Sequence, residues 1–468
     1  MQVIDRRQFI IMDQPYNRED FKSIVLHSGM ILSYHEDLHI QIKEDTLLLG
    51  LAFSSETENI TLENPLKERF HWSGRWILIH DDKLYLDPCG TLGVFWGYCG
   101  DKLVCSSSLN LMKSVLETEW IADYQIQYND GLPYMDYYPI PFTPYRGIQK
   151  MYPTQYLDLL NHSFHSENEL WYKQYSECSI EDLFTILCEK LLCIFRNISN
   201  MYGENIWIPL TAGVDSRCCV SLAQKAGIRF GTYTAIRDNI DGWDKKAPLL
   251  ISKKLGIKHF YMNDMAVNNA DRERMYDNHC GGKVSVGTDR TQFIANNDVP
   301  NAKDSIVLWG TAWELYGRNF WGVLNTCQNN AERLEEWNQY SGEAIYKSNI
   351  HTSSLKEWLS YVEENEMATM DWRQRMYYEQ RIGSWLSTAY QAIDLFDSDR
   401  ISPVNCYDIF GILMNLVDKT FPDGERSDKR YQIRIIEEFT PEISDIPYEK
   451  NKSYVYRIIR KITRMLKN

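Results

Sequence analysis

A short polar stretch between two apolar segments carries the clearest chemical signal in this sequence. Residues 206–210 read as a buried strand and residues 215–226 as a helix, and the link between them is Thr211-Ala212-Gly213-Val214-Asp215-Ser216. A glycine-containing turn at a helix N-terminus presents backbone N–H groups to an anion. An acid in the same turn can hold a Mg²⁺ ion bound to the same phosphates. We therefore interpret the stretch as a phosphate-binding loop, against the alternative of an ordinary capped helix.

The elements around this loop must place it at the edge of a sheet. Strands are expected over 229–235 and 258–262, with a helix over 243–255 between them. Such alternation indicates right-handed βαβ units and a parallel sheet. In sheets of this kind, ligands bind beyond the carboxyl ends of the strands, which is where the loop lies.

The first part of the chain reads mostly as β structure. Two short strands flank an Asp-Asp-Lys turn within 74–88, and a similar pair lies within 93–108. A charged connection over 165–178 then leads to a helix that Ser179 and Asp182 start as a capping box. The sequence therefore predicts a two-domain α/β protein, in which a β-rich sandwich precedes a doubly wound parallel sheet.

Composition limits the class of protein. The 468 residues include 64 Asp and Glu against 50 Lys and Arg, a net charge of −14, which disfavours a nucleic-acid partner. No apolar run approaches the ~20 residues of a membrane span, and the N-terminus lacks a secretory signal. The 11 cysteines show no paired C-x-x-C spacing, which favours reduced thiols over a disulfide framework or a zinc site. We expect a cytoplasmic enzyme.

Several stretches together resemble the asparagine synthetase family. The loop at 211–216 is similar to the family's pyrophosphate-binding loop, Ser-Gly-Gly-x-Asp-Ser, and the hairpins within 74–108 resemble those of its glutaminase domain. Other stretches similar to family segments are PYRGIQKMYPTQYLDL, KKAPLLISKKLGIKHFYM, IVLWGTAWELYGRNF (306–320), RMYYEQRIGSWLS (375–387), RISPVNCYDIFGILMNL (400–416) and GERSDKRYQIRIIEEFTPEISDIPYEKNK.

The resemblance implies a fold, an activity and cofactors. It implies a glutaminase-like, Ntn-type domain over 1–170 and a synthetase domain with a PP-loop over 175–450. In this family a substrate carboxylate attacks the α-phosphate of ATP, giving an acyl-adenylate and pyrophosphate, and an amine then displaces AMP. ATP and Mg²⁺ are the implied cofactors. The implied partner is a substrate bearing a carboxylate and an amine, and a partner protein from a biosynthetic cluster is compatible with this interpretation.

The resemblance also implies roles for the residues of the nucleotide site. Adenine would lie on the backbone of Tyr233, Thr234 and Ala235, and Mg²⁺ on Asp215 and Glu314. For Glu314, the alternative is a surface position after a core strand. Pyrophosphate would lie on the loop residues Thr211, Ala212, Gly213, Val214, Asp215 and Ser216.

Three further residues are implied to act on the reacting groups. Lys450 would stabilise the transition state, with Lys452 as the second choice and a solvated surface lysine as the alternative. Glu379 and Arg381 would line the acceptor site, and a structural ion pair is their alternative. Arg217, next to the loop, would contact phosphate or face solvent.

Three departures from the family pattern shape the expected function. Gln2 stands where the glutaminase has its nucleophilic cysteine and cannot attack an amide. Ala212 replaces a loop glycine, which adds a Cβ near the phosphates. Trp313 replaces an acid that often binds metal. We therefore expect amide formation without glutamine hydrolysis, as in the β-lactam synthetases and lasso-peptide cyclases.

The sequence is compatible with more than one substrate class and with more than one role for the segment 451–468. One alternative is ring closure (macrolactam formation) in a peptide, and the other is amidation of aspartate or a sugar acid with ammonia. A non-catalytic binding homologue is a third possibility, from a different functional class. The basic amphipathic segment 451–468 is interpreted as a docking helix, with a membrane-surface or peptide contact as the alternative.

Overall fold

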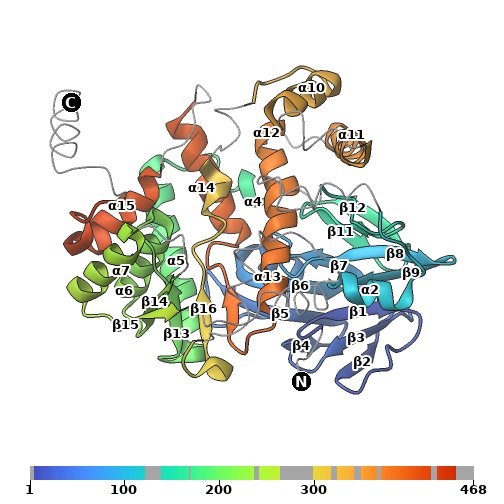
Figure 1. The fold of residues 1–468 in the computed structure, drawn as a ribbon, viewed down its shortest axis with the longest axis horizontal. Helices are drawn as coiled ribbons and strands as arrows, with labels where there is room; N and C mark the ends of the chain where they lie inside the picture. The colour runs from blue at the N-terminus through green and yellow to red at the C-terminus, as the bar shows by residue number, and fades with distance from the viewer. Residues whose placement is uncertain are drawn as a thin grey trace.

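The computed structural model is a mixed α/β protein that contains three sheets (Figure 1). The part of the chain that it describes comprises residues 5–121, 139–167, 170–236, 242–263, 299–317, 324–341, 349–365, 370–422 and 429–448. Gln2, Lys450, Lys452 and the segment 451–468 therefore lie outside the described residues.

Two antiparallel six-stranded sheets form a sandwich in the first part of the chain. In spatial order, the first sheet contains β10 (Gln149–Lys150), β8 (Phe95–Cys99), β9 (Lys102–Ser106), β1 (Phe9–Met12), β3 (Ile31–His35) and β2 (Phe21–Val25). The second contains β12 (Ser163–Ser166), β11 (Gln155–Asp158), β7 (Lys83–Leu86), β6 (Trp72–His80), β5 (Thr46–Ser54) and β4 (Ile40–Lys43).

The alternation of side chains along each strand explains why these sheets stack. Ile77 and Ile79 of β6 point into the core shared by the two sheets, whereas Trp76 and Leu78 point to the opposite face of their sheet. β6 is therefore buried on both faces. The hairpin expected within 74–88 is confirmed as β6 and β7, and the one within 93–108 is confirmed as β8 and β9.

A parallel five-stranded sheet forms the other half of the fold. Its spatial order is β15 (His259–Asn263), β14 (Gly231–Ile236), β13 (Ile206–Pro209), β16 (Ile306–Leu308) and β17 (Asp399–Ile401). Helices α6 (Val214–Ala226) and α7 (Gly242–Leu255) follow β13 and β14. Strands β14 and β15 are added on one side of β13, and β16 and β17 are then added on its other side. The strand order therefore reverses between β13 and β16. Such a switch point is where a parallel sheet offers a crevice for ligands.

Two long helices connect the sandwich to the parallel sheet. Helix α5 (Ile180–Tyr202) contacts β5, α6 and α14 (Tyr407–Thr420). Its first turn is capped as expected, since Ser179 Oγ accepts a hydrogen bond from the Asp182 amide. Apolar residues of β6, α5, α6 and α14 belong to one continuous core, so the two halves share their largest buried interior.

A helical rod over 372–393 packs between the two halves in Figure 1. It consists of α12 (Trp372–Arg375), a π-helical stretch (Met376–Leu386) and α13 (Ser387–Ile393). A Cβ on Gly383 would lie 2.4 Å from Pro153 Cγ, so glycine permits close packing of the rod on the sandwich. π-Helical turns are rare and often occur at functional sites.

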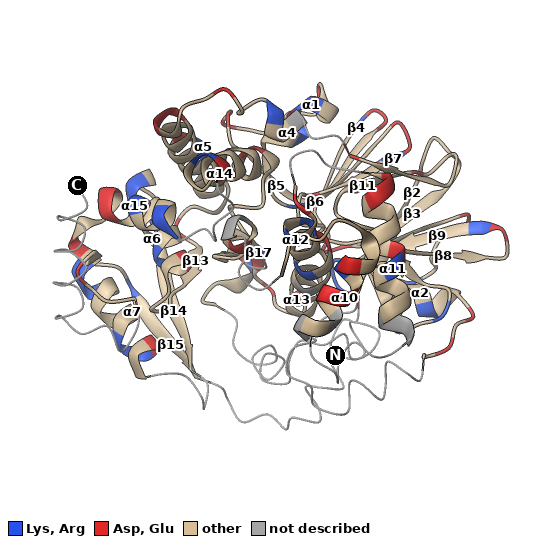
Figure 2. Ribbon diagram, turned by 90° about the horizontal axis from the view of Figure 1, so that it is seen from above, with Lys and Arg blue, Asp and Glu red and all other residues tan. Residues whose placement is uncertain are grey.

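The remaining helices are shorter or more peripheral. Their bounds are α1 (Pro65–Glu68), α2 (Leu109–Val115), α4 (Leu170–Lys173), α10 (Asn330–Ser341), α11 (Asn349–Glu364), α15 (Arg430–Phe439) and the short 3-10 turns at Arg69–His71, Ala302–Asp304, Trp313–Gly317 and Pro441–Ile443. Figure 2 shows both signs of charge on α15, where Arg434 bonds Glu438 and also Glu181 of α5. Among the described helices, none is long and apolar enough to cross a membrane.

Candidate functional site

The stretch 211–216 lies at the switch point of the parallel sheet. β13 ends at Pro209 and α6 begins at Val214 with Gly213 as its N-cap. Gly213 has extended backbone angles and, as a glycine, has no side chain with which to cap the helix. The first amides of a helix have no carbonyl of the same helix to bond, so the first turn of α6 offers backbone N–H groups at the carboxyl edge of the sheet.

The loop is held in shape by its own side chains. Thr211 N donates to Ser216 Oγ at 3.2 Å, and the hydroxyls of these two residues lie 3.1 Å apart. The Gly213 amide donates to Thr211 Oγ1 at 3.0 Å. Because Thr211 and Gly213 are exposed, their groups can meet a ligand at the surface.

Ala212 differs from its neighbours in facing inward. It is 3% exposed and belongs to the main hydrophobic core, so its methyl group packs against the protein interior. Its amide donates to Asp244 Oδ1, in the first turn of α7, at 2.9 Å. The extra methyl at this position is therefore accommodated by the core.

The segment after β16 meets the loop from the other side of the switch point. A Cβ on Gly310 would lie 3.1 Å from the carbonyl carbon of Asp215 and 3.2 Å from Ser216 N. Trp313 is 1% exposed and packs in the core. Glu314 follows it, with Oε2 closed off from solvent.

Charged side chains from four parts of the chain interact here. Lys429 Nζ lies 2.5 Å from Asp215 Oδ2, although the two residues are far apart in sequence. Burial raises the pKa of Glu314, and the charge of Asp215 raises it further, whereas Lys429 and Arg381 lower it. Glu314 is therefore within electrostatic range of Asp215, Lys429 and Arg381.

The two acids offer carboxylate oxygens that suit a divalent cation. Asp215 Oδ1 is buried and accepts no hydrogen bond from the described residues. The pKa of Glu314 is raised partly because a second carboxylate lies nearby. A hard cation such as Mg²⁺ prefers carboxylate oxygens and would relieve both costs. The residues present therefore fit the ion that the sequence predicts.

The residues expected at the adenine lie on β14. Pro209 of β13 pairs with Tyr233, and β14 then continues to Ile236 alongside β15. Thr234 Oγ1 donates to Leu210 O at 2.6 Å. The backbone of 234–236 therefore extends past the last paired residue of β13, on the loop side of the sheet.

Glu379 and Arg381 have different surroundings. Glu379 is fully buried, and its oxygens accept from Arg375 Nε at 2.9 Å, from Trp358 Nε1 at 2.6 Å and from Thr154 Oγ1. These contacts tie the rod to the sandwich and make an ion pair with Arg375 instead of Arg381. The charge of Arg381 lowers the pKa of Glu314, so Arg381 lies within electrostatic range of that acid.

Arg217 adopts neither of its two expected positions. It is fully buried and donates to Ile446 O and Pro447 O, each at 2.6 Å. Its guanidinium lies over the Tyr448 ring, 4.5 Å from the centroid. The expectation that it contacts phosphate or faces solvent was wrong, because the C-terminal segment covers it.

Sequence analysis did not identify Lys429 as a site residue. It is the N-cap residue of α15, within the stretch GERSDKRYQIRIIEEFTPEISDIPYEKNK that resembles a family segment. A signal was available, because a lysine directly before an amphipathic helix is an exposed cation near a helix start. Its approach to Asp215 depends on the packing of α15 against α6.

A second group of possible metal ligands lies between the sandwich and the helices. Glu56 Oε1, His71 Nδ1 and Asp408 Oδ2 lie within 4.8 Å of one another. However, Lys190 Nζ lies 2.7 Å from both Glu56 Oε1 and Asp408 Oδ2. This ammonium already pairs with both carboxylates, so we interpret the group as an ion network that joins α5 to α14.

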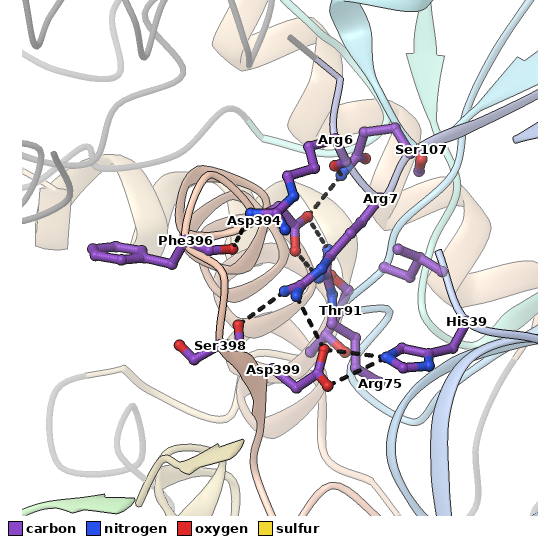
Figure 3. Close-up of polar contacts among 12 residues, drawn as sticks. Arg6, Arg7, His39, Arg75, Thr91, Ser107, Asp394, Phe396, Ser398 and Asp399 are labelled. Atoms are coloured by element: carbon purple, nitrogen blue, oxygen red, sulfur yellow. Dashed lines mark hydrogen bonds and ion pairs between the residues drawn. The ribbon is translucent and has the colours of Figure 1, made fainter. Parts of the chain in front are cut away.

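A further polar region occupies the amino edge of the parallel sheet. Arg7 donates to Ser398 O at 2.9 Å and Asp397 O at 2.8 Å, and it pairs with Asp399 (Figure 3). Asp399 also bonds His39 and accepts from Tyr202 OH at 2.7 Å. A cavity of about 650 Å³ opens beside these residues. We refer to this region as the seam.

Comparisons with known proteins give little information about this site. No family model matches the chain, and no curated protein matches it. Among solved structures, the chain is similar to the NMN synthetase from Francisella tularensis, with 13% identity and a TM-score of 0.20. That likeness covers 43% of this chain and 93% of the other.

Proposed function

We propose that this protein is an ATP-dependent, amide-bond-forming ligase of the asparagine synthetase type. It would activate a substrate carboxylate as an acyl-adenylate, releasing pyrophosphate, and an amine would then displace AMP. The observation that carries the proposal is the convergence of Asp215 and Glu314 beside a helix N-terminus at the switch point of the parallel sheet.

The loop residues would hold the pyrophosphate portion of ATP. The first-turn amides of α6 point out of the helix end, and the hydroxyls of Thr211 and Ser216 stand beside them. Lys429 adds a cation at the same place. Together these groups would stabilise the negative charge that develops on the leaving pyrophosphate.

A Mg²⁺ ion bound by Asp215 and Glu314 would neutralise phosphate charge and polarise the phosphoryl oxygens. Lys429 would then release Asp215 and turn to the phosphates, because both cations compete for the same carboxylate. Arg381, which acts on Glu314, would hold that side chain ionised. Adenine would lie along the end of β14, next to Ala235.

The acyl and amine groups would meet on the side of the loop that faces the helical rod. Arg381 would contact the carboxylate to be activated, and Lys450 would stabilise the transition state of amide formation. Glu379 would act through the rod, because its own oxygens already bond Arg375, Trp358 and Thr154. Holding both reactants in one geometry supplies much of the acceleration in such a reaction.

The N-terminal sandwich would be a degenerate, Ntn-type glutaminase domain. Gln2 cannot act as a nucleophile, so the amine would come from the substrate or from free ammonia. Ring closure within a peptide is the substrate class that we propose first, and ammonia-dependent amidation of a small acid is the alternative.

The test is to measure AMP and pyrophosphate release from MgATP, together with product mass. Substrate panels would contain leader-free peptides, aspartate with ammonium, and glutamine. Asp215→Asn is the loss-of-function variant, and Asp304→Asn, an exposed acid at the amino edge of the sheet, is the matched control. A peptide product lighter by one water would support ring closure, and asparagine formed from ammonium would support the alternative. Absence of both MgATP binding and turnover would overturn the proposal.

A further inference from the structure

The first turn of α7 contacts both the loop 211–216 and the segment 446–448. Asp244 Oδ1 accepts the Ala212 amide at 2.9 Å. The preceding residue, Trp243, donates its indole N–H to Pro447 O at 3.0 Å. The adjacent side chains of Trp243 and Asp244 therefore bond two segments, at Pro447 and at Ala212, that are far apart in sequence.

The bond from Ala212 to Asp244 meets a specific need of the loop. Ala212 is 3% exposed, and a buried amide without an acceptor is costly. The amides of Thr211 and Gly213 are satisfied within the loop, by Ser216 Oγ and Thr211 Oγ1. Ala212 alone among these three residues relies on a side chain from another helix.

The chemistry of Asp244 indicates a geometric role. A carboxylate close to a phosphate-binding loop repels the phosphates, so its charge opposes the function that we propose. An acid is nevertheless present, and its oxygen lies at hydrogen-bonding distance from the loop amide. What Asp244 supplies is an acceptor at a fixed position, which holds residue 212 inward while the amides of α6 face outward.

The C-terminal segment braces the same turn. Arg217 follows the loop on α6 and donates to Ile446 O and Pro447 O. The carbonyl of Pro447 thus receives hydrogen bonds from the first turns of both α6 and α7. Because these two turns share one acceptor, the position of Asp244 relative to the loop is fixed from two sides.

We propose that Asp244 is a positioning residue that preorganises the loop for pyrophosphate through the Ala212 amide. The proposal rests on the proposed function, because it assumes that the loop binds phosphate groups. Asparagine at this position would keep the acceptor oxygen and lose the charge. Alanine would lose both.

The experiment measures binding of MgATP and of Mg-pyrophosphate to the full-length protein by titration calorimetry. Asp244→Ala should weaken both affinities by about tenfold, the expected effect of one lost hydrogen bond to a buried amide. Asp244→Asn should stay within about threefold of the unmodified protein. Asp304→Ala, an exposed acid remote from the loop, is the control and should change nothing.

Asp244→Ser serves if the alanine variant does not fold. Its hydroxyl suits a helix start but is too short to reach the amide, so it should bind as weakly as alanine. Thermal unfolding of every variant separates a binding effect from a folding effect.

Each other outcome would overturn the inference. Equal affinities for Asp244→Ala and the unmodified protein would mean that the loop needs no such support. Equal losses in Asp244→Asn and Asp244→Ala would assign the carboxylate charge to the site, as for a metal ligand. Failure of the unmodified protein to bind either ligand would instead refute the proposed function, so the two failures can be told apart.

Discussion

The two edges of the parallel sheet carry similar charges that are arranged in opposite ways. At the seam, Asp399 is 8% exposed and is met by Arg7, His39 and Tyr202. At the loop edge, Asp215 has one buried oxygen that receives no hydrogen bond from the described residues.

The pKa shifts at the two edges also have opposite signs. Burial raises the pKa of Asp399, but its hydrogen bond with His39 and the charge of Arg7 outweigh it, so the pKa lies below its usual value. The pKa of Glu314 is raised by burial and by Asp215. A carboxylate that is paired in the fold contributes stability, whereas a buried carboxyl group with a raised pKa costs stability when it ionises.

Removing the carboxylate charge at the loop edge should have the largest effect on activity. Asp215→Asn should reduce ATP-dependent AMP formation by roughly 100-fold or more, because one metal ligand and its charge are lost. Its thermal stability should change little. AMP release and the unfolding midpoint would be measured together. An active Asp215→Asn protein would contradict the role of the loop edge as the site.

The same substitution strategy at the seam should affect folding instead of chemistry. Arg75 lines a pocket together with Arg7, His39 and Asp399 of the seam. It forms a buried, bidentate pair with Asp394 (Figure 3), and the two side chains are 10% and 3% exposed. Asp394→Ala should lower the free energy of unfolding by about 3–5 kcal/mol, because it leaves an uncompensated buried charge.

Urea denaturation would measure this loss. The folded fraction of Asp394→Ala should keep the MgATP affinity of the unmodified protein. A loss of affinity without a loss of stability would show that the seam takes part in ligand binding.

Lys429 tests whether a cation at the loop edge serves the ligand or the fold. Lys429→Met should weaken MgATP binding by about tenfold, close to 1.4 kcal/mol. Its unfolding free energy should change by only about 0–1 kcal/mol, because the pair with Asp215 is half-exposed. Lys303→Met, an exposed lysine at the seam, is the matched control. Weaker stability with unchanged binding would make Lys429 structural.

The smallest expected effects come from neutralising one acid at each edge. Glu314 has a raised pKa in the folded protein, so its ionisation lowers the free energy of unfolding as pH rises through that pKa. Glu314→Gln should therefore stabilise the protein at pH 7 by roughly 0.5–2 kcal/mol. Asp399 has a lowered pKa, so its contribution is present above the unfolded pKa and is lost as pH falls through the folded one.

Asp399→Asn should therefore destabilise the protein by about 1–3 kcal/mol at pH 7 and flatten the acid side of the stability profile. Unfolding curves between pH 3 and pH 8 would measure both variants. A change of the same sign in both would remove the distinction between the two edges.

Local patterns explain what sequence reasoning could anticipate. The strand at 206–210 and the helix from 215 follow from apolar spacing, and Ser179 starts α5 because its hydroxyl accepts the Asp182 amide. The (i,i+4) spacing of Arg375 and Glu379 could also have predicted their ion pair, since such residues face each other on a helix. Glu379 and Arg381 are two positions apart, so they do not face each other on a helix.

Other features depend on contacts between distant segments. The expected site contained Glu314 but missed Lys429, which reaches Asp215 only because α15 packs on α6. The burial of Arg217 under the segment around Pro447 likewise had no local signal.

Local sequence patterns account for the strand–loop–helix unit at 206–226, the hairpins of the sandwich and the acid in the loop. These follow from periodicity, turn residues and residue chemistry, which act over a few positions. Long-range packing sets which charges meet beside the loop, turns the Ala212 methyl group toward the core, and places Asp244 where it accepts the Ala212 amide. Those outcomes depend on how helices dock on a sheet, because docking is governed by the total buried surface and not by any one neighbourhood in the chain.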